Sequence, residues 1–456
     1  MHYMTLPDDF KAAFKDADIR GRYPHEINEV LAYRVGCALV LLLEAKEVIV
    51  ARDMRSSSPA VMQALCEGAR DSGGHVLDLG LMPTTVLYRA SGDWDAWGVM
   101  VTASHNPADQ NGLKIVRPGA VPLTKATGLQ KIQRYVEQFS IEKQIKVRRG
   151  NKTKRTCLRS YVRTIEREVP LTASKPLKIV ADAGNGMASV MLSALHKNPA
   201  YTIDVLNETL DGTFPVRASN PMLRKNQRPI RQALQRGSYD LGVSFDGDGD
   251  RIAFFLPNGT MLNGAVAGAM IAEQIIATHP KATCVDTVFN SRIYRETVRA
   301  AGGVIKKARV GHAFIKNQMR KHDAVFACEH SGHYYFRANY YADSSLLALR
   351  YMMQAILNTG GDMTAAVRPY QMYYQTEEIL VEVPDKKAIL KKLQEKYSKQ
   401  TDSTVRVFDG VNVELSDVWF TVKPSVTEDA LKFVVESHQK KRAVAVQKEL
   451  QQFLLQ

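Results

Sequence analysis

Glu47-Val-Ile-Val-Ala-Arg-Asp53 is a short apolar run, followed by residues 58–72 with helical spacing, by Gly73-Gly74 and by Val76-Leu-Asp-Leu79. The apolar run predicts a buried strand, and the glycine pair marks the turn from the helix into a second strand. Short apolar strands that alternate with helices are typical of parallel βαβ units, in which helices cover the sheet. This stretch therefore predicts an α/β domain.

The same order of elements occurs twice more along the chain. Leu177-Lys-Ile-Val-Ala-Asp182 precedes a glycine-rich turn, a helix through about residue 195 and a strand over 201–206. The third copy has a strand over 282–286, a helix over about 291–301, and Gly302-Gly303 before a strand that starts at Val304. Because the copies begin a domain's length apart, we expect three related α/β domains with mixed sheets.

The rest of the chain, from about Val367, has a different pattern. Residues 377–383 and 411–422 alternate between apolar and polar side chains, whereas residues 386–399 and about 438–455 have helical spacing. This pattern predicts a smaller α+β domain at the C-terminal end. We place the four predicted domains at residues 1–150, 151–256, 257–368 and 369–456.

The composition is that of a folded protein. The chain has 456 residues, of which 45% are hydrophobic and 24% charged, and these values exclude disorder, collagen and coiled coil. The net charge of +14 favours anionic partners, which can be phosphorylated metabolites, nucleic acid or anionic lipid, and composition alone does not choose among them. Neither a secretory signal nor an apolar run of about 20 residues is present, so we expect no membrane partner. Five scattered cysteines without a Cys-x-x-Cys pair fit a reducing cytoplasm.

A basic stretch over residues 143–159 lies near the first predicted domain boundary. We interpret it as a solvated junction between two domains, although a nucleic-acid-binding patch would have the same composition. Because it has no interleaved aromatic residues and no recognisable binding module, we expect no nucleic-acid partner.

The first candidate for chemistry is Val101-Thr-Ala-Ser-His-Asn-Pro107, which follows a predicted strand over 97–101. Ser104 would then lie at the carboxyl end of a strand, where α/β sheets expose reactive groups. A serine near His105 and Lys114 can act as a nucleophile if a base or a metal activates it. The alternative is an ordinary polar turn that ends in proline.

The second candidate is Ser244-Phe-Asp-Gly-Asp-Gly-Asp-Arg251, which also follows an apolar strand. Asp246, Asp248 and Asp250 alternate with glycines that let the backbone curl, so their carboxylates can face one cation. Without a cation, the clustered carboxylates would repel one another or shift their pKa values. A metal-free acidic turn is the alternative, and an EF-hand would require a glutamate at its twelfth position, where this chain has Pro257. Neither alternative explains Arg251, which is well placed to meet a phosphate oxygen.

Two further segments carry polar groups that suit a sugar. Gly311-His312 precedes Lys316, and Glu329-His-Ser331-Gly-His333 places a carboxylate and several donors in one turn. A lone histidine such as His312 is more often structural than catalytic, whereas Glu329, Ser331 and His333 together suit sugar hydroxyls.

These motifs together resemble the α-D-phosphohexomutases, most closely the bacterial phosphomannomutase/phosphoglucomutase branch. The resemblance extends nearly from end to end, and the motifs that carry it are Phe14-Lys-Asp-Ala-Asp-Ile-Arg-Gly21, Arg52-Asp-Met-Arg55, Thr102-Ala-Ser-His-Asn-Pro107, Asp246-Gly-Asp-Gly-Asp-Arg251 and Glu329-His-Ser-Gly-His333. It implies three α/β domains and a fourth of a different type around a central cleft. It also implies a mutase that interconverts hexose 1-phosphate and hexose 6-phosphate, with mannose and glucose phosphates as substrates.

The resemblance also implies a role for each candidate residue. Ser104 would carry a phosphoryl group, with Mg²⁺ held by its oxygen and by Asp246, Asp248 and Asp250. Arg20 and Arg251 would contact the transferring phosphate, and His105 and Lys114 would serve as general acid or base. On the sugar side, the implied residues are His312, Glu329, Ser331 and His333. Hexose 1,6-bisphosphate would be both intermediate and activator, and we expect a cytoplasmic monomer or homodimer.

The phosphate loop departs from the family pattern Arg-x-Ser-Asn-Thr-Glu-Pro. This chain has Lys423-Pro-Ser425-Val426-Thr427-Glu428-Asp429, so a bidentate arginine and an asparagine donor are both absent. Lys423, Ser425 and Thr427 can still bind phosphate, and we expect a working enzyme with a raised KM. The neighbours of Glu329, Cys328 and His330, also differ from the commoner glycine and methionine.

Two other functions stay open from the sequence. One is a mutase for another sugar, such as glucosamine phosphate. The other is a catalytically weakened binding or regulatory homologue, for which the altered phosphate loop and the charge of +14 are the arguments.

Overall fold

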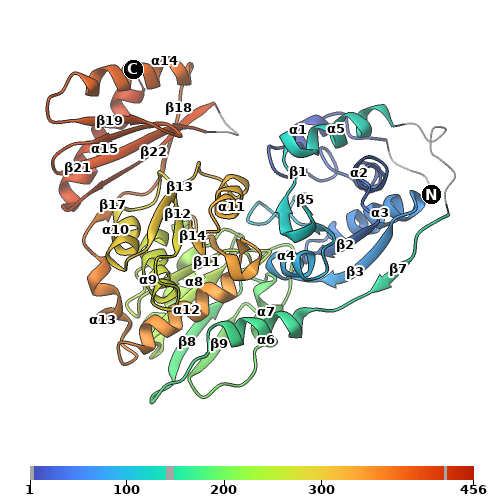
Figure 1. The fold of residues 1–456 in the computed structure, drawn as a ribbon, viewed down its shortest axis with the longest axis horizontal. Helices are drawn as coiled ribbons and strands as arrows, with labels where there is room; N and C mark the ends of the chain where they lie inside the picture. Colours follow the sequence, from blue (N-terminus) through green and yellow to red (C-terminus); the bar gives the residue numbers. More distant parts are fainter. Residues whose placement is uncertain (1–4, 140–147, 426–428, 456) are drawn as a thin grey trace. The chain divides into compact units, whose positions relative to one another are not determined.

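The computed structural model describes residues 5–139, 148–425 and 429–455 (Figure 1). The chain divides into two compact units. The first unit comprises Met1–Met261 and Gly332–Met363, and the second comprises Leu262–Ser331 and Thr364–Gln456. In the part of the chain that the structure describes, every helix is too short or too polar to cross a bilayer.

The first sheet of the first unit contains seven strands. They are β1 (Ile19–Arg22), β2 (Glu47–Arg52), β3 (His75–Leu81), β4 (Trp97–Val101), β5 (Gln110–Arg117), β6 (Val121–Pro122) and β7 (Lys152–Lys154). Their order is β1-β5-β4-β2-β3-β7, and β6 pairs with β5. The accompanying helices are α1 (Phe10–Ala13), α2 (Glu29–Leu43), α3 (Ser58–Asp71), α4 (Thr84–Asp93) and α5 (Leu129–Gln138), with short 3₁₀ turns η1 (Pro118–Ala120) and η2 (Lys125–Thr127).

The centre of this sheet has the predicted βαβ arrangement. Strand β2 runs parallel to both β3 and β4, and α3 lies between β2 and β3 in the chain. Helices α2 and α3 pack closely, since a Cβ atom on Gly68 would lie 2.0 Å from the carbonyl oxygen of Tyr33. The antiparallel strands β1 and β5 make the sheet mixed, as expected.

The predicted basic junction contains part of this sheet. Residues 143–147 lie outside the described residues, but β7 pairs in parallel with β3, so the junction is in part an edge strand. Lys152 contacts Asp78 at 2.9 Å, and Arg149 pairs with Glu67 and Asp71 of α3. The basic side chains thus neutralise acidic groups at the sheet edge, where charged residues also block pairing with other chains.

The second sheet of the first unit has four strands. They are β8 (Leu177–Asp182), β9 (Tyr201–Leu206), β10 (Leu241–Phe245) and β11 (Ile252–Phe255), in the order β11-β10-β8-β9. The predicted strands over 177–182 and 201–206 are confirmed as a parallel pair. Other elements of this unit are α6 (Leu158–Glu168), α7 (Ala188–Ser193), η4 (Arg224–Gln227), α8 (Arg228–Arg236), β15 (Tyr334–Phe336), η5 (Arg337–Asn339), β16 (Ala342–Asp343) and α12 (Ser345–Leu357).

The second unit starts with the third βαβ copy. Its elements are α9 (Gly264–Thr278), β12 (Thr283–Asp286), α10 (Arg292–Ala300), β13 (Val304–Lys307), α11 (His312–Lys321) and β14 (Phe326–Cys328). Strand β12 runs parallel to β13, as the sequence predicts for this copy, and also to β14. Two short segments then lead toward the C-terminal domain: α13 (Met363–Val367) and η6 (Arg368–Tyr370).

The C-terminal domain is built on an antiparallel sheet with the order β17-β22-β21-β20-β19, and β18 pairs with β22. These strands are β17 (Tyr374–Gln375), β18 (Ile379–Glu382), β19 (Thr404–Val407), β20 (Val411–Glu414), β21 (Val418–Pro424) and β22 (Ala430–Ser437), and the helices are α14 (Lys386–Ser398) and α15 (Lys440–Leu454). The alternation over 411–422 covers two strands, because the chain turns after Leu415, whose N–H donates to the carbonyl oxygen of Val418. The fold is therefore three α/β domains followed by a β-rich domain, which confirms the predicted class.

Candidate active site

Ser104 lies in a tight loop at the carboxyl end of β4. Its side chain is buried, and its backbone has φ of 53°, a left-handed conformation that is uncommon for a residue other than glycine. The hydroxyl oxygen lies 3.2 Å from Nδ1 of His105, and the Ser104 N–H donates to Oγ1 of Thr102 at 2.8 Å. Such strain persists only where the surroundings hold the backbone in place.

Arg55 supplies most of that restraint. Its guanidinium is fully buried and donates to the carbonyl oxygens of Ser104 (2.9 Å), Asn106 (2.7 Å), Pro107 and Gln110 (2.9 Å). Asp53 pairs with Arg55 at 3.1 Å and accepts the hydroxyl of Thr102 at 2.7 Å. One buried ion pair thus fixes the whole loop from residue 104 to residue 110.

The aspartate loop follows β10 and lies directly against the serine loop. The hydroxyl of Ser104 donates to Oδ2 of Asp246 at 3.1 Å. Ser219 joins the two loops, because its hydroxyl donates to the Ser104 carbonyl at 3.0 Å and accepts the N–H of Gly247 at 2.8 Å. A Cβ atom on Gly247 would lie 2.6 Å from the Ser219 oxygen, so only glycine permits this approach.

Arg217 holds the aspartate loop from the other side. This buried arginine pairs with Asp182 and donates to the Ser244 hydroxyl at 3.0 Å and to the Phe245 carbonyl at 2.7 Å. Its role parallels that of Arg55, since in both loops a buried arginine binds backbone carbonyls just before or after the reactive side chains.

Lys114, on β5, faces the carboxylates of the aspartate loop. Its ammonium lies 2.6 Å from Oδ2 of Asp248 and 2.5 Å from Oδ2 of Asp250, and Asp248 also accepts the hydroxyl of Thr84 at 2.6 Å. Burial acts to lower the pKa of Lys114, but the two carboxylates outweigh it and hold that pKa well above its ordinary value. Lys114 therefore contributes a fixed positive charge.

The carboxylates differ in their surroundings. Burial, with Asp250 and Asp248 nearby, raises the pKa of Asp246 well above its ordinary value. Burial also acts to raise the pKa of Asp250, but Lys114, His333 and Arg251 hold it well below the ordinary range. The cluster is thus an assembly of opposed charges, and removal of any one member leaves another uncompensated.

Three more candidates of the first unit, Arg20, Arg251 and His333, contact the serine loop or the aspartate loop. Nε of Arg251 lies 3.1 Å from Nε2 of His333, which is 3.4 Å from Oδ1 of Asp250. Arg20, on β1, pairs with Asp18 and donates to Oδ1 of Asn106 at 3.3 Å. Burial and the nearby cations Arg251 and Arg20 lower the pKa of His105 well below its ordinary value, so its imidazole is neutral.

The aspartate loop fits a magnesium ion. Asp246, Asp248 and Asp250 each offer a carboxylate oxygen, and these atoms lie within 4.8 Å of one another. Oδ1 of Asp248 is buried and accepts no hydrogen bond from the described residues, and the neighbour of Oδ1 of Asp250 is Nε2 of His333 at 3.4 Å. Such oxygens favour a hard cation, and a set of carboxylates beside a phosphate is a common arrangement for Mg²⁺.

The remaining candidates belong to the second unit. His312 is the first residue of α11, and Glu329 and Ser331 follow β14 in one loop. Glu329 is buried and Ser331 half-buried. Between them, His330 places Nε2 3.2 Å from Glu378 and packs edge-on against Phe289. The loop is thus anchored to the C-terminal domain through residue 330.

Lys423 ends in a buried ion pair with Asp409. The distance from Nζ to Oδ2 is 2.9 Å, and the same carboxylate oxygen accepts the N–H of Val310 at 2.8 Å. Asp409 therefore connects Lys423 with the segment that leads into His312. Ser425 is buried, and its N–H donates to the carbonyl of Ala430 at 2.9 Å. Thr427 lies outside the described residues.

Several residues that shape the site were not among the sequence-based candidates. They are Asp53, Arg55, Thr84, Arg217, Ser219 and Asp409. Arg55 stood in a quoted motif, and a charged pair directly after a buried strand was the available signal. Ser219 and Asp409 gave no such signal, because their partners are 115 and 14 residues away in the chain.

Comparison with known proteins identifies three successive domains in the chain. Models of the phosphoglucomutase/phosphomannomutase α/β/α domains I, II and III match residues 11–142, 159–259 and 263–373. A relative named "Phosphohexose mutases" from Xanthomonas campestris pv. campestris (strain B100) is 35% identical over 95% of this chain and 96% of its own. The phosphomannomutase of Escherichia coli (strain K12) is 32% identical, with 93% and 94% of the two chains covered.

A solved structure agrees with these relatives. The crystal structure of a phosphoglucomutase/phosphomannomutase family protein from Burkholderia thailandensis has a TM-score of 0.86 and 27% identity, and 97% of each chain is covered. The chain belongs to the phosphoglucomutase/phosphomannomutase family, and it is a mutase enzyme.

Proposed function

We propose that this mutase interconverts the 1-phosphates and 6-phosphates of hexoses, with mannose and glucose phosphates as substrates. Relatives named phosphomannomutase support the sugar class. The observation that carries the proposal is the position of Ser104. Its hydroxyl oxygen lies 3.1 Å from Asp246, in a strained loop beside three carboxylates and cationic side chains.

The reaction would proceed in two transfers. In the first, the phosphorus–oxygen bond at Ser104 breaks as a new bond forms to the free hydroxyl of a hexose 1-phosphate, and the proton of that hydroxyl ends on the serine oxygen. The resulting hexose 1,6-bisphosphate would then change its orientation in the site, so that its other phosphate faces Ser104. In the second transfer, the bond between the phosphorus and the oxygen at C1 of the sugar breaks as this phosphorus bonds to the Ser104 oxygen. The serine proton passes to the sugar oxygen, and hexose 6-phosphate leaves. Atoms and charge balance over the cycle.

The residues of the first unit would position and neutralise the transferring group. Phosphoryl transfer depends mainly on alignment and on compensation of oxygen charge. Arg20, Arg251 and Lys114 supply positive charge, while Arg55 holds the serine backbone. His105 Nδ1 lies 3.2 Å from the Ser104 oxygen, close enough to hold or accept its proton. When bound by Asp246, Asp248, Asp250 and the serine oxygen, Mg²⁺ would neutralise further charge on the phosphate.

The residues of the second unit would bind the sugar and the phosphate that does not react. Glu329 and Ser331 suit sugar hydroxyls, together with His333 of the first unit, and His312 would lie on the sugar side. Lys423, Ser425 and Thr427 would bind the other phosphate. The Lys423–Asp409 pair adds a reason for the expected raised KM, because a substrate phosphate must compete with a carboxylate already 2.9 Å from the ammonium.

Other features inferred from the sequence remain predictions. They include the cytoplasmic location, a monomer or homodimer, a phosphorylated Ser104, and the domain boundaries at 1–150, 151–256, 257–368 and 369–456. Glucosamine phosphate also remains a possible substrate for the test below.

The test compares the wild type with Ser104→Ala in the conversion of mannose, glucose and glucosamine 1-phosphates, with Mg²⁺ and a trace of hexose 1,6-bisphosphate. We expect mannose and glucose phosphates to be the best substrates. We also expect Ser104→Ala to lose about a thousandfold or more in turnover, because it lacks the phosphoryl carrier. Ser72→Ala, which changes a buried serine at the end of α3, is the matched control and should retain activity.

A chelator should abolish wild-type turnover, and added Mg²⁺ should restore it. Turnover at the wild-type rate in Ser104→Ala would contradict the proposal that Ser104 carries the phosphoryl group. A folded wild type that converts only glucosamine phosphate would contradict the proposed sugar class.

A further inference from the structure

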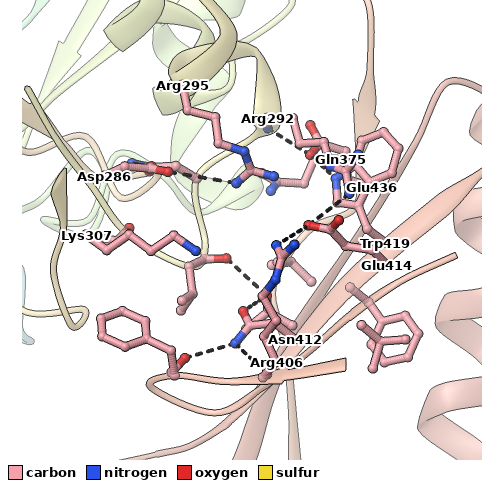
Figure 2. Close-up of a pocket in the computed structure, with 18 of the residues that line it drawn as sticks. Asp286, Arg292, Arg295, Lys307, Gln375, Arg406, Asn412, Glu414, Trp419 and Glu436 are labelled. Atoms are coloured by element: carbon pink, nitrogen blue, oxygen red, sulfur yellow. Dashed lines mark hydrogen bonds and ion pairs between the residues drawn. The ribbon is translucent and has the colours of Figure 1, made fainter. Parts of the chain in front are cut away.

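A polar cavity of about 390 Å³ lies in the second unit (Figure 2). One wall is the carboxyl end of β12 with helix α10, and the other is the face of strands β19, β20 and β21 of the C-terminal sheet. The described residues that line it include no member of the proposed sugar or phosphate sites. The cavity therefore shares no lining residue with the site to which the mutase function is assigned.

Five basic side chains line this cavity. They are Arg292, Arg295, Arg299, Lys307 and Arg406. Arg292 and Arg406 share one carboxylate oxygen of Glu414, at 3.2 and 3.3 Å. Among the residues that the structure describes, neither Arg299 nor Lys307 has an ion-pair partner. Figure 2 shows Arg295, Lys307 and Arg406 arranged around the same space.

Four acidic side chains also line the cavity, and each of them has a hydrogen bond or an ion pair with a described residue. Glu436 accepts the Ser291 hydroxyl, the Arg292 N–H at 3.0 Å and the Trp419 indole N–H at 2.5 Å, and burial raises its pKa. Glu296 accepts the hydroxyl of Tyr373 at 2.7 Å. Asp286 lies 3.8 Å from Arg295, and burial raises its pKa to about 6. Five basic side chains against four acidic ones give the lining a formal net charge of +1, and the cations outside the ion pairs of the described residues are Arg299 and Lys307.

Buried polar atoms in the lining point to a missing partner. Oγ1 of Thr287, Oδ1 of Asn290 and Nε of Arg292 are buried and make no hydrogen bond with the described residues. Thr287 and Asn290 are 3% and 4% exposed, so both are enclosed almost completely. Buried polar atoms are nearly always satisfied, and an orphaned one costs about 1–3 kcal/mol. The set combines donors with one amide acceptor.

We propose that this cavity binds a small anion with free hydroxyl groups, the chemistry of a phosphate ester of a polyol. The basic side chains would bind the phosphate, and Asn290 Oδ1 would accept a hydroxyl of the ligand. Because the cavity has one wall on α10 and one on the C-terminal sheet, the bound anion would connect the α/β part of this unit to its β-rich domain. The site would thus bind a metabolite without converting it.

Trp419 gives a probe at the cavity itself. The chain has three tryptophans, and Trp419 lines the cavity, with the guanidinium of Arg292 3.7 Å from its ring centroid. In full-length protein carrying Trp94→Phe and Trp97→Phe, the fluorescence of Trp419 should therefore report ligand entry. The titrants are glycerol 3-phosphate and methyl phosphate, which share a phosphate monoester but differ in free hydroxyls.

We expect saturable binding of glycerol 3-phosphate, weaker binding of methyl phosphate, and an affinity about tenfold lower after Arg295→Gln or Lys307→Gln. Lys306→Gln is the matched control, because it removes the same charge from the next residue of β13, which does not line the cavity. Equal loss in Lys306→Gln would show only general attraction to a protein of net charge +14 and would overturn the proposal. So would the absence of saturable binding, or unchanged affinity in Arg295→Gln and Lys307→Gln.

Turnover of hexose phosphate confirms that each variant is folded. If Trp97→Phe unfolds the first unit, calorimetric titration of the other variants in the wild-type background provides the same comparison.

Discussion

The serine loop of the first unit and the phosphate loop of the second are held in different ways. Arg55 binds four carbonyl oxygens of the serine loop and is itself paired with Asp53, so no exchange of partners is open to it. Lys423, by contrast, is held by one ion pair with Asp409, which a phosphate can replace. The group proposed to react is thus held by many bonds, whereas the group proposed to bind the distant phosphate is held by an exchangeable ion pair.

The largest effect should come from breaking the restraint on the serine loop. Arg55→Met leaves Asp53 buried without its cation, and loss of one partner of a buried pair costs about 3–5 kcal/mol. Displacement of the serine by about 1 Å should lower turnover about a hundredfold. Urea denaturation and kcat with glucose 1-phosphate would measure the two effects.

Arg55→Lys tests the geometry separately from the charge. It preserves the charge but not the planar fork, so we expect a folded protein in which kcat falls while KM changes little. Arg52→Gln, which removes a single bond to the carbonyl of Asp53, is the control and should behave nearly as the wild type. Full activity in Arg55→Lys would mean that the loop does not depend on the fork.

A smaller effect, in the opposite direction, should follow from removal of the competitor in the phosphate loop. Asp409→Asn leaves the Lys423 ammonium without its carboxylate, so a substrate phosphate no longer displaces it. We expect KM to fall by about tenfold, because that is the change in affinity that one charge-assisted hydrogen bond produces, and we expect kcat to be nearly unchanged. Steady-state kinetics with mannose 1-phosphate would show this, together with a lower melting temperature in the absence of substrate.

Lys423→Arg changes the other partner of the same ion pair, the cation in place of the carboxylate. A guanidinium can bind Asp409 and a phosphate at once, so KM should fall here as well. A KM that rises in Asp409→Asn would show that Asp409 orients Lys423 for the phosphate instead of competing with it. An unchanged KM in Lys423→Arg would show that the lysine in place of an arginine does not cause a raised KM.

The smallest effect concerns the ion pair between His330 and Glu378, which holds the loop of Glu329 and Ser331 to the C-terminal domain. Burial acts to raise the pKa of Glu378, but His330 and Lys432 outweigh it and lower that pKa to about 2. A lowered acid pKa gives stability that is present above the unfolded value of about 4.3 and is lost as the pH falls toward 2. Because the side chain is 27% exposed, we expect only about 1 kcal/mol.

Glu378→Gln should therefore melt a few degrees below the wild type at pH 7, and the difference should shrink between about pH 5 and pH 3. Thermal melts at each pH would measure it, with Glu377→Gln on the exposed neighbour as control. A difference that stays constant with pH would show that the carboxylate charge is not the stabilising feature.

The sequence predicted the parts of this protein that depend on local order. The βαβ strands at 47–52, 177–182 and 283–286 follow from apolar runs between turns, and the loops of Ser104 and Asp246 follow from residues that lie next to one another in the chain. The two strands within 411–422 were not separated, because the alternation of side chains continues across the turn at Leu415. Arg55 stood in a motif that the sequence analysis quoted, but the motif did not predict the backbone carbonyls of residues 104–110 as its partners.

Local sequence by itself determined the three repeated α/β units, the acidic loop and the position of the serine loop after a strand, since hydrophobic period, turn residues and clustered carboxylates are properties of short segments. Only the tertiary structure decided that Ser219 joins the serine loop to the aspartate loop, that Lys423 is occupied by Asp409, and that five basic side chains from α10, β13 and β19 enclose one cavity. The reason is physical: these contacts join residues brought together by chain folding, and their energies depend on burial and distance, which sequence order does not fix.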